Sequence, residues 1–316
     1  MPISELELIA DLFAPLATSK GALGLTDDVA LVAPRAGHEI VVTTDAIVAG
    51  VDFFGDDPAA TIAQKALRVN LSDLAAKGAV PFGYLLTLVL PDTVTPAWLR
   101  AFARGLAADQ KAFGITLLGG DLSSTPGPLT VSVTGFGYVP RGRAILRRGA
   151  KPGDLVFVTG TIGDSGGGLN ALKTKRRNTV LIGRYRVPQP RVAFGIRLRG
   201  IASAALDVSD GLLADLEHIA DVSRVHIAVA ASRVPLSAAL RKAGGDVASA
   251  ATAGDDYEIA FTAPRARRAR VMRAALAAGV TVTEIGFVVK GRGVALLGAD
   301  GKAIPVKKKG WQHFSR

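Results

Sequence analysis

The chain has 316 residues and a net charge of +11 at neutral pH, and 49% of its residues are hydrophobic and 21% charged. This composition is typical of a globular protein and the length predicts two domains, while the lack of cysteine excludes disulfides, thiolate catalysis and cysteine-ligated zinc and fits a cytoplasmic location. No apolar run approaches the roughly 20 residues of a membrane helix, and the basic runs lack interleaved aromatic residues, so neither a membrane nor nucleic acid is an expected partner.

Helical and extended patterns alternate in the first half of the chain. Residues 3–18 predict a helix, with Ser4 as the N-cap and Glu7 as its capping-box partner. A helix over 57–78 is favoured by Asp57 as a cap and by Pro58 at the first helical position. The other expected elements are strands over 31–33 and 39–44, an extended piece over 48–54, a strand over 84–90, a helix over 96–113, and strands over 115–118 and 129–138.

Residues 139–154, a segment rich in Pro, Gly and Arg, form the expected domain boundary. We therefore expect an N-terminal domain over 1–140 and a C-terminal domain over 141–316. The mixed order of strands and helices predicts α+β layers rather than a regular βαβ winding. The second domain is expected to contain a strand over 155–159, a Gly-rich turn, a helix from about Ser165, and helices near 211–222, 236–243 and 266–278 with strands among them.

Aspartates stand where apolar or small-residue runs end. Any one of them can be a turn former that bonds its own backbone. Turns rarely need so many, whereas Mg²⁺ prefers oxygen ligands and is typically held by a few carboxylates together with substrate phosphates. Histidine is nearly absent from these places, which argues against zinc or non-haem iron. The aspartates in question are Asp27, Asp28, Asp45, Asp73, Asp121, Asp207 and Asp210.

Asp73 lies inside a helical pattern, where aspartate and asparagine are poor helix formers. One interpretation is a helix-surface pair between Asp73 and Lys77, which contributes only a few tenths of a kcal/mol. The other places Asn70 and Asp73, three residues apart on one face, against a metal ion.

The segment 158–169 combines a strand, a Gly-rich turn and the start of a helix, where free backbone N–H groups can meet a phosphate. It is neither a Walker A loop nor a dinucleotide fingerprint. Its Gly-Asp-Ser-Gly-Gly string imitates a serine-protease nucleophile segment, but the only histidine before it, His38, has no suitable motif around it. A tight turn that needs small residues and a direct ligand contact both remain open. Arg147, in the expected boundary, can either reach a phosphate or be a solvated charge.

Read together, these motifs resemble the thiamine-monophosphate kinase family, part of the superfamily that includes aminoimidazole ribonucleotide synthetase. The likeness spans nearly the whole chain, and seven motifs in the family's order make it specific. The motifs are Thr26-Asp27-Asp28-Val29-Ala30, Thr43-Thr44-Asp45, Lys65 to Ala76, Gly119-Gly120-Asp121, Val158 to Asp164, Asp207 to Leu212 and Gly254 to Ile259.

The resemblance implies a two-domain aminoimidazole ribonucleotide synthetase-like α+β fold, with an N-terminal mixed sheet and helices and a C-terminal α/β layer domain, assembled as a homodimer. It implies ATP-dependent phosphorylation of thiamine monophosphate, assisted by several Mg²⁺ ions and without a strong general base, because the acceptor is itself a phosphate. The implied metal ligands are Asp28, Thr43, Thr44, Asp45, Asp73, Asp121, Asp207 and Asp210. The implied ATP contacts are Gly120, Asp121, Arg147 and Ser209, and the implied acceptor contacts are Asp52, Asp255 and Trp311.

Four residues depart from the family pattern, and two of them fall on the acceptor side. Asp52 stands where the family has a histidine, and Asp255 stands where it has a glutamate; Thr26 and Leu122 are the other two. A carboxylate at Asp52 would repel a phosphate unless a cation lies nearby. Another acceptor within the superfamily, or a non-catalytic sensor of nucleotide or thiamine phosphate, therefore remain the alternatives.

Overall fold

The computed structural model describes residues 5–312, and the chain divides into two compact units. The first comprises the residues up to 74 together with 79–142, and the second comprises 75–78 together with the residues from 143 onward. Each combines a sheet with helices, so the predicted α+β class is confirmed. The expected N-cap Ser4 lies outside the described residues. Between residues 5 and 312, no helix is both long and apolar enough to cross a membrane.

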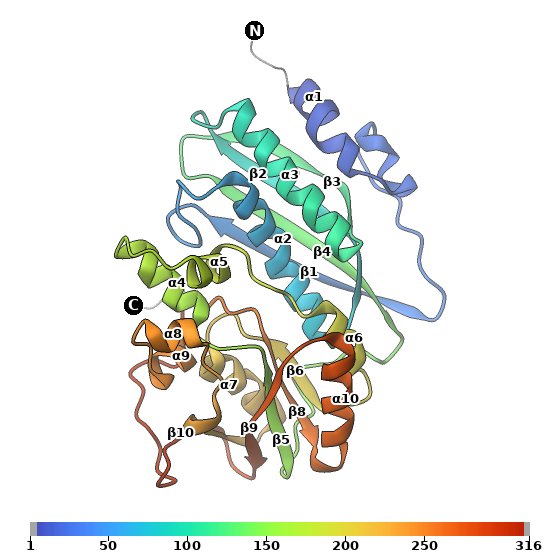
Figure 1. Ribbon diagram of the computed structural model, residues 1–316. Coiled ribbons are helices and arrows are strands. Elements are labelled where there is room, and N and C mark those ends of the chain that lie inside the picture. Colours follow the sequence, from blue (N-terminus) through green and yellow to red (C-terminus); the bar gives the residue numbers. More distant parts are fainter. Residues whose placement is uncertain (1–4, 313–316) are drawn as a thin grey trace. The chain divides into compact units, whose positions relative to one another are not determined.

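The first unit contains a four-stranded sheet and two long helices (Figure 1). The strand order is β1-β4-β2-β3, with β2 and β3 parallel and the other neighbours antiparallel. The elements are α1 (Glu5–Leu8), η1 (Ile9–Phe13), η2 (Ala14–Leu16), η3 (Lys20–Leu25), β1 (His38–Val48), α2 (Ala59–Ala76), β2 (Val80–Pro91), α3 (Pro96–Phe113), β3 (Thr116–Thr125) and β4 (Thr130–Pro140).

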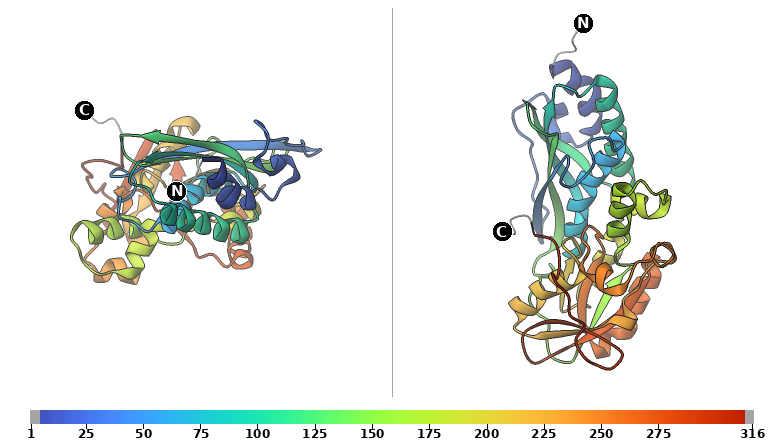
Figure 2. Two further views of the ribbon diagram at one scale, coloured as in Figure 1. Left: turned by 90° about the horizontal axis from the view of Figure 1, so that it is seen from above. Right: turned by 90° about the vertical axis from the view of Figure 1, so that its left-hand side faces the viewer.

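Helices α2 and α3 lie against one face of this sheet, as Figure 2 shows. Along β4, Val131 and Val133 are buried, whereas Ser132 and Thr134 are only partly buried. This alternation is typical of an antiparallel sheet that is covered on one side. Since residues paired across strands share a face, the register of β4 assigns each β1, β2 and β3 side chain to the covered or the open face.

Two extended segments predicted near β1 are not strands. In the segment 31–33, Leu31 is 65% exposed and its amide bonds only to the Gly21 carbonyl, so the short apolar run has no partner strand. The segment 48–54 is a turn, because Gly50 has a φ of 83° and the Asp52 side chain accepts a hydrogen bond from the Val48 amide at 2.8 Å. The predicted strand over 39–44 is present as part of β1.

The second unit is a six-stranded sheet with the order β10-β7-β9-β5-β8-β6. Only β10 and β7 pair in parallel, and the other neighbours are antiparallel. Its strands are β5 (Asp154–Thr159), β6 (Ala204–Asp207), β7 (His226–Ala230), β8 (Ile259–Pro264), β9 (Val282–Val289) and β10 (Gly293–Leu297). Its helices are α4 (Asp164–Lys173), α5 (Thr179–Arg186), α6 (Val192–Leu198), α7 (Leu212–Ser223), η4 (Ala231–Arg233), α8 (Ala238–Lys242), α9 (Val247–Thr252), η5 (Arg265–Arg267) and α10 (Arg268–Ala278).

This second sheet has a core on each face, as its fully buried strands β5 and β6 require. Along β5, Val156 and Val158 belong to a cluster that includes side chains of α7. Leu155 and Phe157, which alternate with them, belong to another cluster that includes side chains of α6 and α10. The sheet therefore holds the strand ends at β5, β6 and β8 in fixed positions relative to one another.

Candidate functional site

The first unit brings Thr43, Asp45 and Asp73 together on the covered face of its sheet. The Thr43 hydroxyl on β1 donates a hydrogen bond of 2.5 Å to Asp73 Oδ2 on α2. Asp45 lies two residues further along β1, on the same face as Thr43. The alternative of a surface pair between Asp73 and Lys77 is not needed to explain Asp73, because its carboxylate is turned toward β1.

The surroundings of Asp45 fit a cation. Burial, together with the nearby carboxylates of Asp73 and Asp52, raises the pKa of Asp45 to about 6. Neither Asp45 nor Asp73 forms an ion pair with a basic side chain within residues 5–312. Crowded carboxylate oxygens without a basic partner are a donor set that suits Mg²⁺.

Thr44, Gly120 and Asp121 do not join that group. Thr44 and Asp121 lie on the open face of the sheet, where Thr44 shares a hydrogen bond of 3.0 Å with Thr134. Asp121 Oδ2 accepts a hydrogen bond from the Ser123 hydroxyl at 2.9 Å. The β1 and β3 strands are the two edges of the sheet, three strand spacings or roughly 14 Å apart.

The surroundings of three sequence candidates of the first unit, Asp28, Gly120 and Asp52, are described by exposure, packing and a backbone contact. Asp28 is exposed in the loop that follows η3. A Cβ at Gly120 would lie 1.8 Å from the Leu86 carbonyl oxygen, so the glycine is required where β3 packs on β2. The Asp52 carboxylate, besides raising the pKa of Asp45, accepts the Val48 amide and closes the 48–52 turn.

The second unit organises its candidates around the end of β6 and the loop 208–211 that follows it. Asp207 is buried at the end of β6, and Ser209 and Asp210 follow in the loop. One oxygen of Asp215, on α7, accepts the backbone N–H groups of Ser209, Asp210 and Gly211, each at 3.0 Å. Burial and the charge of Asp210 raise the pKa of Asp215 to about 7. The three hydrogen bonds from backbone N–H groups lower it, but by less.

Two of the three acceptor-side candidates, Asp255 and Trp311, are attached to this same loop through their backbones. The Asp255 amide donates to the Ser209 carbonyl at 2.7 Å, and the Trp311 amide donates to the Asp210 carbonyl at 2.9 Å. An ion pair between Lys309 and Glu217 holds the chain just before Trp311. The Trp311 side chain is 56% exposed.

Arg147 lies on a segment that is fixed beside β6. The Leu146 carbonyl accepts the Ala205 amide at 3.0 Å, and the Ser223 hydroxyl accepts the Gly149 amide at 3.1 Å. The Arg147 side chain between these attachments is exposed. Asp210, Asp215 and His218 form a further group in the described chain whose ligand atoms lie within 4.8 Å of one another. Sequence reasoning assigned no function to His218.

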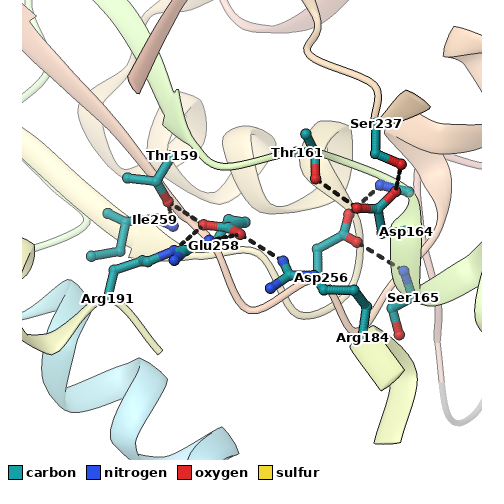
Figure 3. A network of polar contacts seen from close by, with 11 residues as sticks. Thr159, Thr161, Asp164, Ser165, Arg184, Arg191, Ser237, Asp256, Glu258 and Ile259 are labelled. Atoms are coloured by element: carbon teal, nitrogen blue, oxygen red, sulfur yellow. Dashed lines mark hydrogen bonds and ion pairs between the residues drawn. The ribbon is translucent and has the colours of Figure 1, made fainter. Parts of the chain in front are cut away.

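Two amides of the Gly-rich turn are bonded to a side chain of the protein itself. Asp256, fully enclosed in the second unit, accepts the Gly163 amide at 2.6 Å and the Ser165 amide at 3.3 Å at the start of α4 (Figure 3). Burial raises the pKa of Asp256 well above its usual value, and the two amides and the Arg184 charge oppose that shift. The tight turn of small residues is present, and Asp256 occupies two of its amides. Ser165 Oγ is itself buried, which is incompatible with a protease nucleophile.

Glu258 is the second buried acid that the sequence reasoning missed. Figure 3 shows it between two arginines: it accepts Arg184 Nη2 at 2.6 Å, Arg191 Nε at 2.7 Å and Arg191 Nη2 at 2.6 Å. The Thr159 hydroxyl adds a hydrogen bond of 2.6 Å. A Cβ at Gly160 would lie 2.1 Å from Glu258 Oε1, so this glycine makes room for the carboxylate. One sequence signal could have pointed to Asp256 and Glu258: both lie in the same motif as Asp255.

Comparison with known proteins identifies the family. The chain matches the family models described as AIR synthase related protein, N-terminal domain, over residues 26–139 and C-terminal domain over residues 151–298. The thiamine-monophosphate kinase of Caulobacter vibrioides is 44% identical, over 99% of this chain and 91% of that protein.

Two solved structures agree with this assignment. The thiamine-monophosphate kinase from Stenotrophomonas maltophilia is 41% identical with a TM-score of 0.81, over 89% of this chain and 91% of that one. A structure described as AaThiL complexed with AMPPCP and TMP is 32% identical with a TM-score of 0.80, over 91% of each chain. By sequence and by fold, the chain therefore belongs to the thiamine-monophosphate kinase family of AIR synthase related proteins.

Proposed function

We propose that this protein transfers the γ-phosphoryl group of ATP to thiamine monophosphate, which yields thiamine diphosphate and ADP. The observation that carries the proposal is the similarity to kinases of this name over nearly the whole chain, at 44% identity to the Caulobacter protein. The related structure that contains AMPPCP and TMP supports both substrates. A cytoplasmic location, where ATP is abundant, is part of the proposal.

The proposed division of labour follows the two halves of the chain. Residues 1–140 bind ATP and magnesium and form the dimer contact, and residues 141–316 complete the nucleotide and acceptor sites. The Mg²⁺ ions, when bound, would neutralise charge on the transferring phosphate. The proposed metal ligands are Asp28, Thr43, Thr44, Asp45, Asp73, Asp121, Asp207 and Asp210. The proposed ATP contacts are Gly120, Asp121, Arg147 and Ser209.

The chain's own residues have positioning roles in this scheme. Thr43 holds one oxygen of Asp73 through its hydrogen bond, which supports a fixed orientation of that carboxylate. Asp215 holds three consecutive amides of the loop that carries Ser209 and Asp210. Because the acceptor is a phosphate, orientation and charge neutralisation supply most of the rate and no general base is assigned.

The acceptor contacts are proposed to be Asp52, Asp255 and Trp311. The exposed indole of Trp311 can stack on a cationic ring, and Asp255 adds a negative charge beside it. The family histidine is replaced by Asp52, whose carboxylate is bonded to the Val48 amide. That bond supports a role for Asp52 in shaping the turn rather than in repelling a phosphate.

One assay tests the proposal directly. Purified protein with Mg²⁺, ATP and thiamine monophosphate should form thiamine diphosphate and ADP in equal amounts. If ATP is consumed only with a different acceptor, the substrate assignment is wrong. Calorimetry addresses the alternative of a sensor, because tight binding of both ligands without product would favour that role.

A homodimer formed through the open sheet faces is also part of the proposal. That face exposes three large apolar side chains, Ile40 (43%), Val42 (57%) and Leu85 (37%). Thr44 and Asp121 lie on this face, whereas Asp45 and Asp73 lie on the other side of the sheet. In the proposed dimer, the site therefore receives residues from both copies. Sedimentation should show a dimer, and Val42→Glu should shift it to monomer; an unchanged dimer would contradict this arrangement.

A further inference from the structure

The second unit contains a cavity with a volume of about 550 Å³ that lies among α4, the segment 176–178, α5 and α8. These three helices pack against one another (Figure 1). Small-molecule sites typically have volumes of about 300–1,000 Å³. None of the residues that line this cavity belongs to the proposed metal, ATP or acceptor sets. It is therefore a separate feature of the second unit, with room for a small molecule.

The lining of the cavity is chemically divided. Ala239 and Ala243, which are accessible, give it an apolar part. Arg176, Arg177 and Lys242 add three positive charges, and none of the lining residues is acidic. Such a division suits a ligand that carries both an apolar group and a strong negative charge.

The three basic side chains are not used elsewhere in the described chain. Arg176, Arg177 and Lys242 are exposed, and within residues 5–312 none of them forms an ion pair or a side-chain hydrogen bond. Four of the five residues from Lys173 to Arg177 are basic. Like charges this close repel one another, and a bound anion relieves that repulsion.

The basic segment is nevertheless held in place by its backbone. The Arg176 amide donates to the Ala171 carbonyl at 2.8 Å, and the Thr174 hydroxyl donates to the Asn170 carbonyl at 2.7 Å. On the other side, the Asn178 side chain accepts the Leu181 amide at 3.1 Å and caps α5. Arg176 and Arg177 thus lie between two fixed helix ends, which lowers the entropy lost when they bind a ligand.

We propose that this cavity is a binding site for a small organic phosphate, separate from the catalytic site. Its phosphate groups bind Arg176, Arg177 and Lys242, and its apolar ring lies over Ala239 and Ala243. Planar guanidinium groups suit phosphate oxygens, which they can contact in pairs. A nucleic-acid strand is disfavoured because the lining contains no aromatic residue for base stacking.

Hydrogen exchange on the full chain, in EDTA and without ATP turnover, tests this site independently of the kinase proposal. The probes are ADP, thiamine diphosphate and inorganic pyrophosphate. We expect ADP or thiamine diphosphate to slow exchange in peptides that cover 170–181 and 238–243, and the stronger of the two identifies the source of the ligand. Binding at the catalytic site would instead protect the peptides around 207–211.

Two variants and one control decide the outcome. The double variant Arg176→Gln with Arg177→Gln should need at least about ten times more ligand for half-maximal protection. Ala243→Phe should block the cavity without a change of charge. The control, Arg270→Gln with Arg273→Gln, removes the same charge from exposed positions on α10 and should bind as wild type. Protection by none of the probes, equal protection by pyrophosphate, or undiminished protection in the double variant would overturn the proposal.

Discussion

Replacement of Glu258 by glutamine tests whether the buried arginine cluster holds the second unit together. The side chain of Glu258 is fully buried, and those of Arg184 and Arg191 are 14% and 19% exposed. Glutamine keeps the size and one acceptor oxygen, but its amide group turns two hydrogens toward guanidinium donors. Two mostly buried cations then lack their counter-charge.

The expected loss follows from that geometry. Removal of one partner from a buried ion pair typically costs about 3–5 kcal/mol, because the remaining charge stays desolvated. For a unit of this size, each kcal/mol lowers the unfolding midpoint by about 2–4 °C. We therefore expect a fall of about 6–20 °C, measured by circular dichroism in EDTA so that bound ligands do not contribute.

The chain offers a matched control in Glu284. This residue also accepts hydrogen bonds from two arginines, Arg233 Nη1 at 3.3 Å and Arg268 Nε at 2.7 Å, but those side chains are 58% and 56% exposed. Exposed pairs contribute about 0–1 kcal/mol, so Glu284→Gln should lower the midpoint by less than about 4 °C. Similar shifts of the midpoint in the two variants would refute the claim that burial determines how much the Glu258 cluster contributes to stability. Adding Arg191→Met to Glu258→Gln should recover part of the loss.

Four further predictions address the site and the pH dependence of stability. Asp73→Asn should abolish Mg²⁺-dependent ATP turnover while leaving the far-ultraviolet dichroism of the protein unchanged, and activity close to wild type would remove Asp73 from the metal set. Trp311→Ala should raise the KM for thiamine monophosphate more than tenfold with the KM for ATP within about twofold, in steady-state assays; equal effects on both would contradict an acceptor contact. Burial raises the pKa of Asp256, so above about pH 3.9 its carboxyl group ionises in the unfolded chain before it ionises in the folded one, and wild type loses stability as pH rises. Asp256→Asn lacks this loss, so its unfolding midpoint relative to wild type should increase between pH 4 and pH 8. The pKa of Asp246 is lowered by its hydrogen bonds to Ser249, so the stability that it contributes is lost only at low pH. The unfolding midpoint of Asp246→Asn relative to wild type should therefore stay constant from pH 5 to pH 8.

Elements with local end signals were predictable from the sequence. Helix α3 spans the predicted residues because Thr95 accepts the Trp98 amide at its start and Gly114, with a φ of 66°, ends it. Short apolar runs carry no such signal. The segment 31–33 and the turn 48–54 look extended in sequence, but whether such a run finds a partner strand depends on contacts far along the chain.

The same limit applies to the site. Sequence motifs located the acids of the first unit, but not the face of the sheet on which each lies, and so gave no sign that Asp45 and Asp121 are separated. Asp256 and Glu258 bind partners 67 to 99 residues away, which no local pattern reveals. The Gly-rich turn was ambiguous for that reason, since the carboxylate that fills it comes from Asp256.

The buried acids also bear on why the acceptor side can differ from the family pattern. Asp255 and Tyr257 both have positive φ, 67° and 51°, which is uncommon for residues other than glycine. The residues that alternate with them, Asp256 and Glu258, are buried and bound to α4 and to the two arginines. Since those contacts hold the backbone of the segment, the shorter side chain at Asp255 changes the reach of the carboxylate without releasing its position. The Tyr257 hydroxyl, which donates to Asp255 Oδ1 at 3.1 Å, further limits its movement. A ligand contact made by Asp255 therefore depends on side-chain length rather than on a different backbone.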